Sequence, residues 1–187
     1  MSKILDAINA VEEDREKALA YARKAHDSQT RSDGSPYIAH PERVAQSIER
    51  FKKSKNLDAL IQAAYLHDTI EDTDTTYEDL EKMFGGLVAS LVQELTSDKD
   101  KVKAMGKTEY LQQKMAGMTS YALVIKLADR LDNVQDIATA KSPSWRRKYK
   151  IETERILSFI ERHRVLTGTH QTIIGLIREK LAEVPLE

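Results

Sequence analysis

The chain has 187 residues, of which 41% are hydrophobic and 32% are charged, and its formal net charge is −1. This balance excludes a disordered chain, and the near-zero charge gives no basic field, so we expect no nucleic-acid partner. No run of about 18 apolar residues is present, and we therefore expect no membrane partner. The sequence lacks cysteine and starts with the acidic stretch MSKILDAINAVEEDREKA, which predicts a cytoplasmic protein without a signal peptide.

Only seven glycines and four prolines interrupt the chain, which is rich in Ala, Leu, Lys and Glu and therefore favours an all-α fold. We predict a single domain covering residues 1–187, built as a bundle of about eight to ten helices. The expected helices cover residues 2–28, 41–51, 56–72, 76–84, 87–95, 108–116, 120–139, 142–164 and 169–184. The lysine-rich segment 98–107 is expected to be a charged loop, either solvated or facing an anionic substrate.

The stretch AAYLHDTIEDT, residues 63–73, is mostly apolar, yet it carries one histidine and three carboxylates within six residues. His67 and Glu71 are four residues apart, and so are Asp68 and Asp72. Residues four apart share a face of a helix, so the four polar groups are expected on two adjacent stripes.

Further polar residues stand in apolar or constrained surroundings far from this stretch. Asp129 and Asn133 are four apart within LVIKLADRLDNV, and His40 directly precedes Pro41. A buried carboxylate without a partner is costly, and one divalent cation would offset several such groups. Two imidazoles and two carboxylates suit Mn²⁺, Fe²⁺ or Zn²⁺ better than Ca²⁺ or Mg²⁺. The pattern therefore predicts a metal site for cutting a phosphate ester, with His40, His67, Asp68 and Asp129 as ligands and Glu71 and Asp72 transferring protons.

The same residues also have simpler interpretations. A His-Asp dipeptide is often a surface pair, and the Glu-Asp pair that follows it can be the polar end of a helix. Asp129 can pair structurally with Lys126 or Arg130. Three further histidines are expected outside the site, namely His26 as a structural residue, and His163 and His170 at the surface or at helix ends.

Four motifs, in this order and spacing, resemble a known family: AHDSQTRSDGSPYIAHP, AAYLHDTIEDTDTT, FGGLVASLVQELTSDK and VIKLADRLDNVQDI. They are similar to the hydrolase domain of the RelA/SpoT alarmone enzymes, within the HD-domain metal phosphohydrolases. The resemblance is greatest to the stand-alone small alarmone hydrolases, including the metazoan SpoT homologues. It covers residues 18–150, most of the chain, and implies an all-α HD domain.

The resemblance also implies roles for single residues. It implies that His40, His67, Asp68 and Asp129 hold one metal ion, commonly Mn²⁺, and that Glu71 and Asp72 position and activate the water. It implies nucleotide contacts from Arg31, Tyr37 and Asn133, with Lys126, Arg130 and Arg146 as further candidates for binding phosphate. The implied reaction is hydrolysis of the 3′-pyrophosphate ester of an alarmone nucleotide, which releases pyrophosphate.

The base preference and the wider function stay open at this point. Many relatives carry Arg or Lys where this chain has Ser32, and Met-Arg or Leu-Arg where it has Val134-Gln135. Guanosine is the default base, and an adenosine alarmone is an open alternative. The chain stops at Glu187, so we expect a hydrolase without a synthetase domain; no oligomeric state is predicted. The alternatives are another HD phosphohydrolase (a nucleotidase or an NADPH 2′-phosphatase), a non-enzymatic partner of a synthetase, and a helical scaffold without metal.

Overall fold

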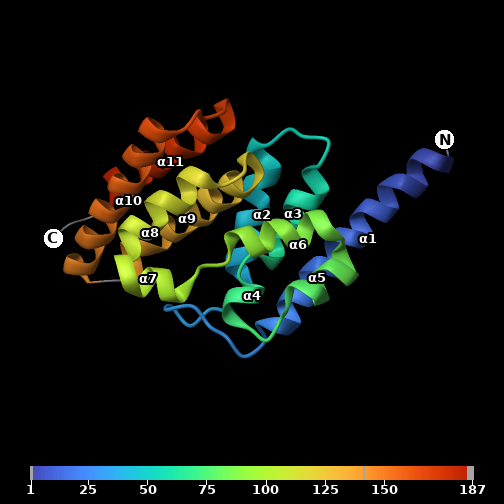
Figure 1. Ribbon diagram of the computed structural model, residues 1–187. Coiled ribbons are helices and arrows are strands. Elements are labelled where there is room, and N and C mark those ends of the chain that lie inside the picture. Colours follow the sequence, from blue (N-terminus) through green and yellow to red (C-terminus); the bar gives the residue numbers. More distant parts are fainter. Residues whose placement is uncertain (1, 141, 185–187) are drawn as a thin grey trace. The chain divides into compact units, whose positions relative to one another are not determined.

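The computed structural model describes residues 2–140 and 142–184, and every regular element within them is a helix (Figure 1). The predicted all-α fold is confirmed. The helices are α1 (Ser2–Ala25), α2 (Ala39–Phe51), α3 (Leu57–Leu66), α4 (Thr69–Asp72), α5 (Tyr77–Phe84), α6 (Gly86–Leu95), α7 (Lys99–Met105), α8 (Lys107–Gly117), α9 (Ser120–Ala140), α10 (Pro143–His163) and α11 (Gly168–Glu183). Their contacts divide the chain into two compact units, Met1–Thr96 and Ser97–Glu187.

In the first unit, α3 is the central helix and packs against α1, α2 and α6 (Figure 1). Its side chains are apolar on nearly all sides, and Leu60, Ala63, Ala64 and Leu66 are fully buried. A helix that is apolar all round belongs inside a core rather than at its edge. The segment that carries the histidine and carboxylates therefore starts from the most buried helix of its unit.

The predicted continuous helix 56–72 is wrong at one point, because α3 ends at Leu66 and the short α4 begins at Thr69. The Thr69 hydroxyl donates a 2.7 Å hydrogen bond to the Leu66 carbonyl. Threonine side chains that bond to nearby backbone groups compete with the helix ladder. His67 and Asp68 thus occupy a junction between two helices.

The predicted boundaries around α5 are confirmed. Thr76 and Asp79 form a reciprocal capping box, in which the Thr76 side chain accepts from the Asp79 N–H and the Asp79 carboxylate accepts from the Thr76 N–H. The Thr76 hydroxyl also donates a 2.7 Å hydrogen bond to this carboxylate, and this bond, together with that from the Thr76 N–H, holds the pKa of the Asp79 carboxyl below its usual value. Gly85 ends the helix with a φ of 84°, a left-handed value that favours glycine.

In the second unit, α9 packs against α11, and α8 packs against α10. The interior of α9 supplies the fully buried Leu123, Val124, Ile125 and Leu127. The start of α10 is as predicted, since the side chain of Ser142, directly before Pro143, accepts a hydrogen bond from the Trp145 N–H. No helix within the described ranges is long and apolar enough to cross a membrane.

The segment 98–107 is a correction to the sequence prediction, because it forms α7 rather than a loop. The Asp98 side chain accepts a 3.0 Å hydrogen bond from the Lys101 N–H, which satisfies one of the donors at the start of the helix. Gly106 then ends the helix with a φ of 86°. The cap at Asp98 and the glycine at position 106 thus set the two ends of a short helix. Its charged sequence has no apolar residues at helical spacing, which is why it was predicted as a loop.

Two isoleucines on α10 test the packing of the second unit. Ile160 is fully buried and Ile151 is 48% exposed. We expect Ile160→Ala to lower the free energy of unfolding by about 2–5 kcal/mol, because it leaves a cavity in the core. Ile151→Ala is the matched control and should change this free energy by no more than about 0.5 kcal/mol. Urea unfolding followed by circular dichroism measures both, and equal losses in the two variants would contradict the packing described.

Candidate functional site

The candidate site of the first unit starts with a tight loop between α1 and α2. Thr30 and Pro36 form an antiparallel bridge, and Gly34 turns the chain with a φ of 86°. The Asp33 carboxylate accepts hydrogen bonds from the backbone and hydroxyl of Ser35 at 2.9 and 2.7 Å, which lower the pKa of the Asp33 carboxyl. This bridged loop presents Arg31 and leads directly into the segment that carries Tyr37 and His40.

His67 lies at the junction between α3 and α4 and is only 1% exposed. Its Nδ1 is 2.8 Å from the Ala64 carbonyl oxygen. A carbonyl only accepts, so we assign the proton to Nδ1, which leaves the lone pair of the neutral ring on Nε2. This Nε2 is 3.0 Å from the Asp68 carboxylate. The backbone therefore fixes the imidazole in the form in which Nε2 can bind a cation.

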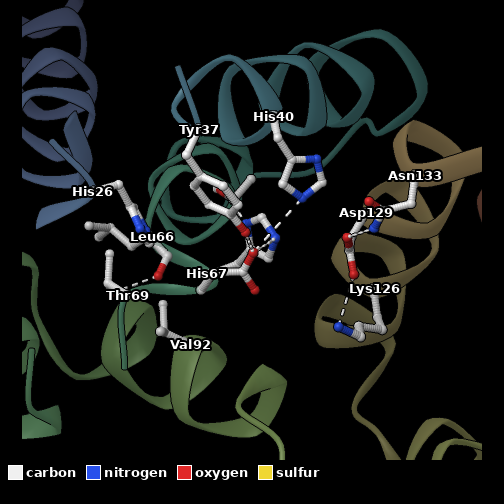
Figure 2. Close-up of polar contacts among 12 residues, drawn as sticks. His26, Tyr37, His40, Leu66, His67, Thr69, Val92, Lys126, Asp129 and Asn133 are labelled. Atoms are coloured by element: carbon white, nitrogen blue, oxygen red, sulfur yellow. Dashed lines mark hydrogen bonds and ion pairs between the residues drawn. The ribbon is translucent and has the colours of Figure 1, made fainter. Parts of the chain in front are cut away.

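A second histidine and a tyrosine converge on the same carboxylate (Figure 2). His40 Nε2 is 3.9 Å from Asp68 Oδ2, and the rings of His40 and His67 have centroids 5.1 Å apart. The hydroxyl of Tyr37 donates a hydrogen bond to the same Asp68 oxygen. Two imidazole nitrogens and a carboxylate oxygen in one buried place form a donor set that fits Mn²⁺, Fe²⁺ or Zn²⁺. The predicted ligands His40, His67 and Asp68 are thus brought together.

Contacts of His26 and Gln29 support this centre, and those of Gln29 were not predicted. The His26 ring lies against Tyr37, with centroids 4.7 Å apart, and its Nδ1 is 2.9 Å from the Gln29 side-chain oxygen. The Gln29 side-chain nitrogen donates a 2.9 Å hydrogen bond to the Asp72 carbonyl. His26 is structural, as expected. Gln29 is a positioning residue that the sequence analysis missed, although it stands two residues before Arg31 in the quoted motif.

The two carboxylates predicted to transfer protons lie on α4. Glu71 is partly buried and Asp72 is exposed. The Asp72 N–H donates a 2.9 Å hydrogen bond to the Asp68 carbonyl, so α4 is joined by its backbone to the junction. Both residues therefore follow the buried centre within one helical turn, on the side that solvent reaches.

The second unit holds the remaining predicted ligand on α9. Asp129 is 7% exposed, and its carboxylate accepts from the Lys126 Nζ at 2.9 Å and from the Asn133 side-chain amide at 2.6 Å (Figure 2). The interpretation that Asp129 pairs with Lys126 is confirmed.

Arg130 is also buried, but its described contacts are internal to the second unit. Its guanidinium donates a 2.8 Å hydrogen bond to Thr153, lies 3.7 Å from Glu152 and stacks over the Tyr149 ring at 5.2 Å. Burial raises the pKa of the Tyr149 hydroxyl. These contacts hold the guanidinium within the second unit, and substrate binding by Arg130 stays a prediction. Arg146 is partly buried near the start of α10.

The two C-terminal histidines serve the helices rather than a site. His163 is exposed, and its ring contacts the Phe159 carbonyl four residues earlier. His170 is fully buried and forms a capping box with Thr167 at the start of α11. The expected helix-end role is thus confirmed for both, while a surface position is wrong for His170.

Comparisons with known proteins agree with this arrangement. The model of the HD domain family matches residues 18–165. The chain is 37% identical to the guanosine-3′,5′-bis(diphosphate) 3′-pyrophosphohydrolase MESH1 of Danio rerio, over 91% of this chain and 92% of that protein. It is 38% identical to the bifunctional (p)ppGpp synthase/hydrolase SpoT of Escherichia coli, over 91% of this chain but 23% of that protein. The solved structure of a metazoan orthologue of SpoT that hydrolyses ppGpp is similar, with a TM-score of 0.77, 28% identity and coverage of 93% and 97%.

The contact between Tyr37 and Asp68 yields a test of the centre. Tyr37→Phe removes only the hydroxyl that orients the carboxylate, and loss of such a supporting hydrogen bond weakens metal binding by about 10–100-fold. Tyr77→Phe is the matched control, because its hydroxyl contacts Glu81 on α5 instead. Titration calorimetry with Mn²⁺ measures both affinities. An unchanged affinity in Tyr37→Phe would show that the hydroxyl does not hold a ligand.

Proposed function

This chain belongs to the HD domain family, and we propose that it hydrolyses the 3′-pyrophosphate ester of (p)ppGpp-type alarmones, releasing pyrophosphate and GDP or GTP. The observation that carries the proposal is the similarity to a stand-alone hydrolase, which spans nearly the whole length of both chains. The buried imidazoles and carboxylate at the junction of α3 and α4 supply chemistry that suits this reaction. The substrate is a small nucleotide, and the cytoplasmic location stays a prediction.

We propose that one divalent cation, Mn²⁺ by preference, binds His40, His67, Asp68 and Asp129. The first three residues are supported by their contacts within the first unit. Asp129 is supported by the family match, which runs over residues 18–165 and includes all four positions. When bound, such a cation acidifies a water molecule and offsets charge on the phosphate. We further propose that residues 1–187 act as one hydrolase domain, because the family match crosses from the first unit into the second.

The residues of the chain have distinct tasks in this reaction. Glu71 and Asp72 take the proton from the attacking water and return one to the leaving oxygen. Tyr37 holds the Asp68 carboxylate, and the Ala64 carbonyl keeps the His67 proton on Nδ1. The other proposed substrate contacts are Arg31, Lys126, Asn133 and Arg146. Cationic and amide donors of this kind stabilise the charge that develops on phosphate oxygens.

The base preference is open at the two places where the chain departs from many relatives, Ser32 and Val134-Gln135. Val134 is 1% exposed, so its side chain belongs to the core of α9 rather than to a ligand. Ser32 is exposed in the bridged loop beside Arg31. Gln135, which stands where many relatives carry arginine, is exposed as well. We propose guanosine as the preferred base and Ser32 and Gln135 as the positions through which an adenosine alarmone would be admitted.

The proposed substrate is tested with the purified chain and Mn²⁺. We expect pyrophosphate to be released from guanosine 3′-pyrophosphates, and at a lower rate from the adenosine analogues; an equal rate would contradict the proposed base preference. NADPH and a plain deoxynucleotide should release no phosphate. Pyrophosphate and inorganic phosphate are measured separately in each reaction. Phosphate from NADPH or the deoxynucleotide alone would replace this function with that of another HD phosphohydrolase.

The roles of the carboxylates are separated by Glu71→Gln. This variant should keep its affinity for Mn²⁺ and lose turnover by about 10²–10⁴-fold, because a positioned acid–base group contributes that much. Glu78→Gln, an exposed residue of α5, is the matched control and should keep both. Calorimetry and the hydrolysis assay together measure the outcome. Full activity in Glu71→Gln would remove this residue from proton transfer.

A further inference from the structure

Charge is distributed unevenly along the chain, although the total is close to zero. Residues 1–96 include 18 acidic and 12 basic residues, a formal charge of −6, whereas residues 97–187 include 12 acidic and 17 basic residues, a charge of +5. The second unit is therefore cationic by itself. A basic unit attracts anions wherever its cations are gathered and left without counter-charges.

Such a gathering lines a groove between α8 and α10. The groove has a volume of about 540 Å³, which is in the size range of small-molecule sites. Arg147, Lys148 and Arg155 supply its positive charge. Thr108 and Ser144 add hydroxyl groups. The wall also includes Ile151, whose 48% exposure leaves an apolar surface open to a ligand.

The acids nearest to these cations along α10 are already engaged elsewhere. Glu152, which also lines the groove, contacts Arg130. Glu154 and Glu161 both contact Arg178 of α11, and the pKa of the Glu161 carboxyl is lowered by this pairing. Within residues 2–140 and 142–184, the side chains of the three groove cations make no ion pair. Their charge is therefore available to an external anion.

Apart from Glu152, which also contacts Arg130 of α9, the charged wall of the groove lies on a different stripe of α10 from Tyr149 and Thr153. Tyr149 and Thr153 contact Arg130 of α9. Arg147, Ile151 and Arg155 recur every four residues on another stripe, offset by about 200° from Tyr149. The groove is thus formed by residues other than those proposed for hydrolysis.

We propose that this groove is a second binding site, which takes the phosphate chain of a nucleoside polyphosphate. Arginine and lysine bind phosphate oxygens through charge-assisted hydrogen bonds, and hydroxyl groups add further donors. The exposed face of Ile151 packs against the nucleoside. The proposal does not depend on the proposed reaction, because none of the groove residues takes part in it.

The chain offers its own reporter for this site. Trp145 is the single tryptophan, is 39% exposed and stacks on Tyr149 with ring centroids 5.0 Å apart. It follows Ser144, a residue of the groove wall. Binding in the groove should therefore change the tryptophan fluorescence of the intact protein.

The experiment titrates GDP and inorganic pyrophosphate into the full chain at constant ionic strength and follows this fluorescence. We expect saturable binding of GDP that Arg155→Gln weakens about tenfold. Arg162→Gln removes the same charge near the end of the same helix, outside the groove, and should bind as the natural chain does. Ile151→Ser should weaken GDP and leave pyrophosphate unchanged.

Several outcomes would overturn the proposal. Equal weakening by Arg155→Gln and Arg162→Gln would mean a diffuse charge effect without a site. Pyrophosphate as tight as GDP, with no effect of Ile151→Ser, would remove the nucleoside from the ligand. The titration is repeated with Asp68→Asn, which impairs the proposed catalytic centre. A signal lost in Asp68→Asn would assign the binding to that centre, whereas a retained signal supports the groove even if no alarmone is hydrolysed.

Discussion

The first unit is organised around the carboxylate of Asp68, which is held in a place where a free carboxylate would be costly. Its side chain is 16% exposed and lies among two imidazoles and a tyrosine hydroxyl. Each partner of Asp68 comes from a different segment. His40 lies on α2, Tyr37 follows the bridged loop, and His67 lies at the end of α3. The position of α3 at the centre of its unit is what brings these segments to one point.

The centre lies where one helix ends and the next begins. His67 follows the end of α3 and Asp68 precedes α4, and both keep right-handed helical backbone angles. The bond from the Thr69 hydroxyl to the Leu66 carbonyl satisfies a backbone group that the break leaves open. The junction therefore costs little hydrogen bonding.

The sequence predicted the residues of the centre better than the shape of the backbone around them. Residue types and spacing identify His40, His67 and Asp68 as candidate ligands, because a metal ion needs nitrogen and oxygen donors and the residue type shows which side chains have them. The break before Thr69 was missed, since the spacing of apolar residues does not depend on hydrogen bonds from side chains to the backbone.

Helix α7 was missed for a related reason, because it depends on one cap at Asp98 rather than on an apolar face. The internal role of Arg130 depends on Glu152 and Thr153, which only the fold brings to it.

Gln29 links the segment before the bridged loop to α4. Its side chain reaches from the segment before the bridged loop to the Asp72 carbonyl on α4, and it also contacts His26. The hydrogen bond from Gln29 to Asp72 therefore connects the segment next to Arg31 with the helix that carries Glu71. Residues joined in one hydrogen-bond network show non-additive effects when they change together. A change of substrate in this architecture should accordingly evolve through paired substitutions, one in the loop and one on α4, since a single step would disturb both the substrate contact proposed for Arg31 and the proton transfer proposed for Glu71.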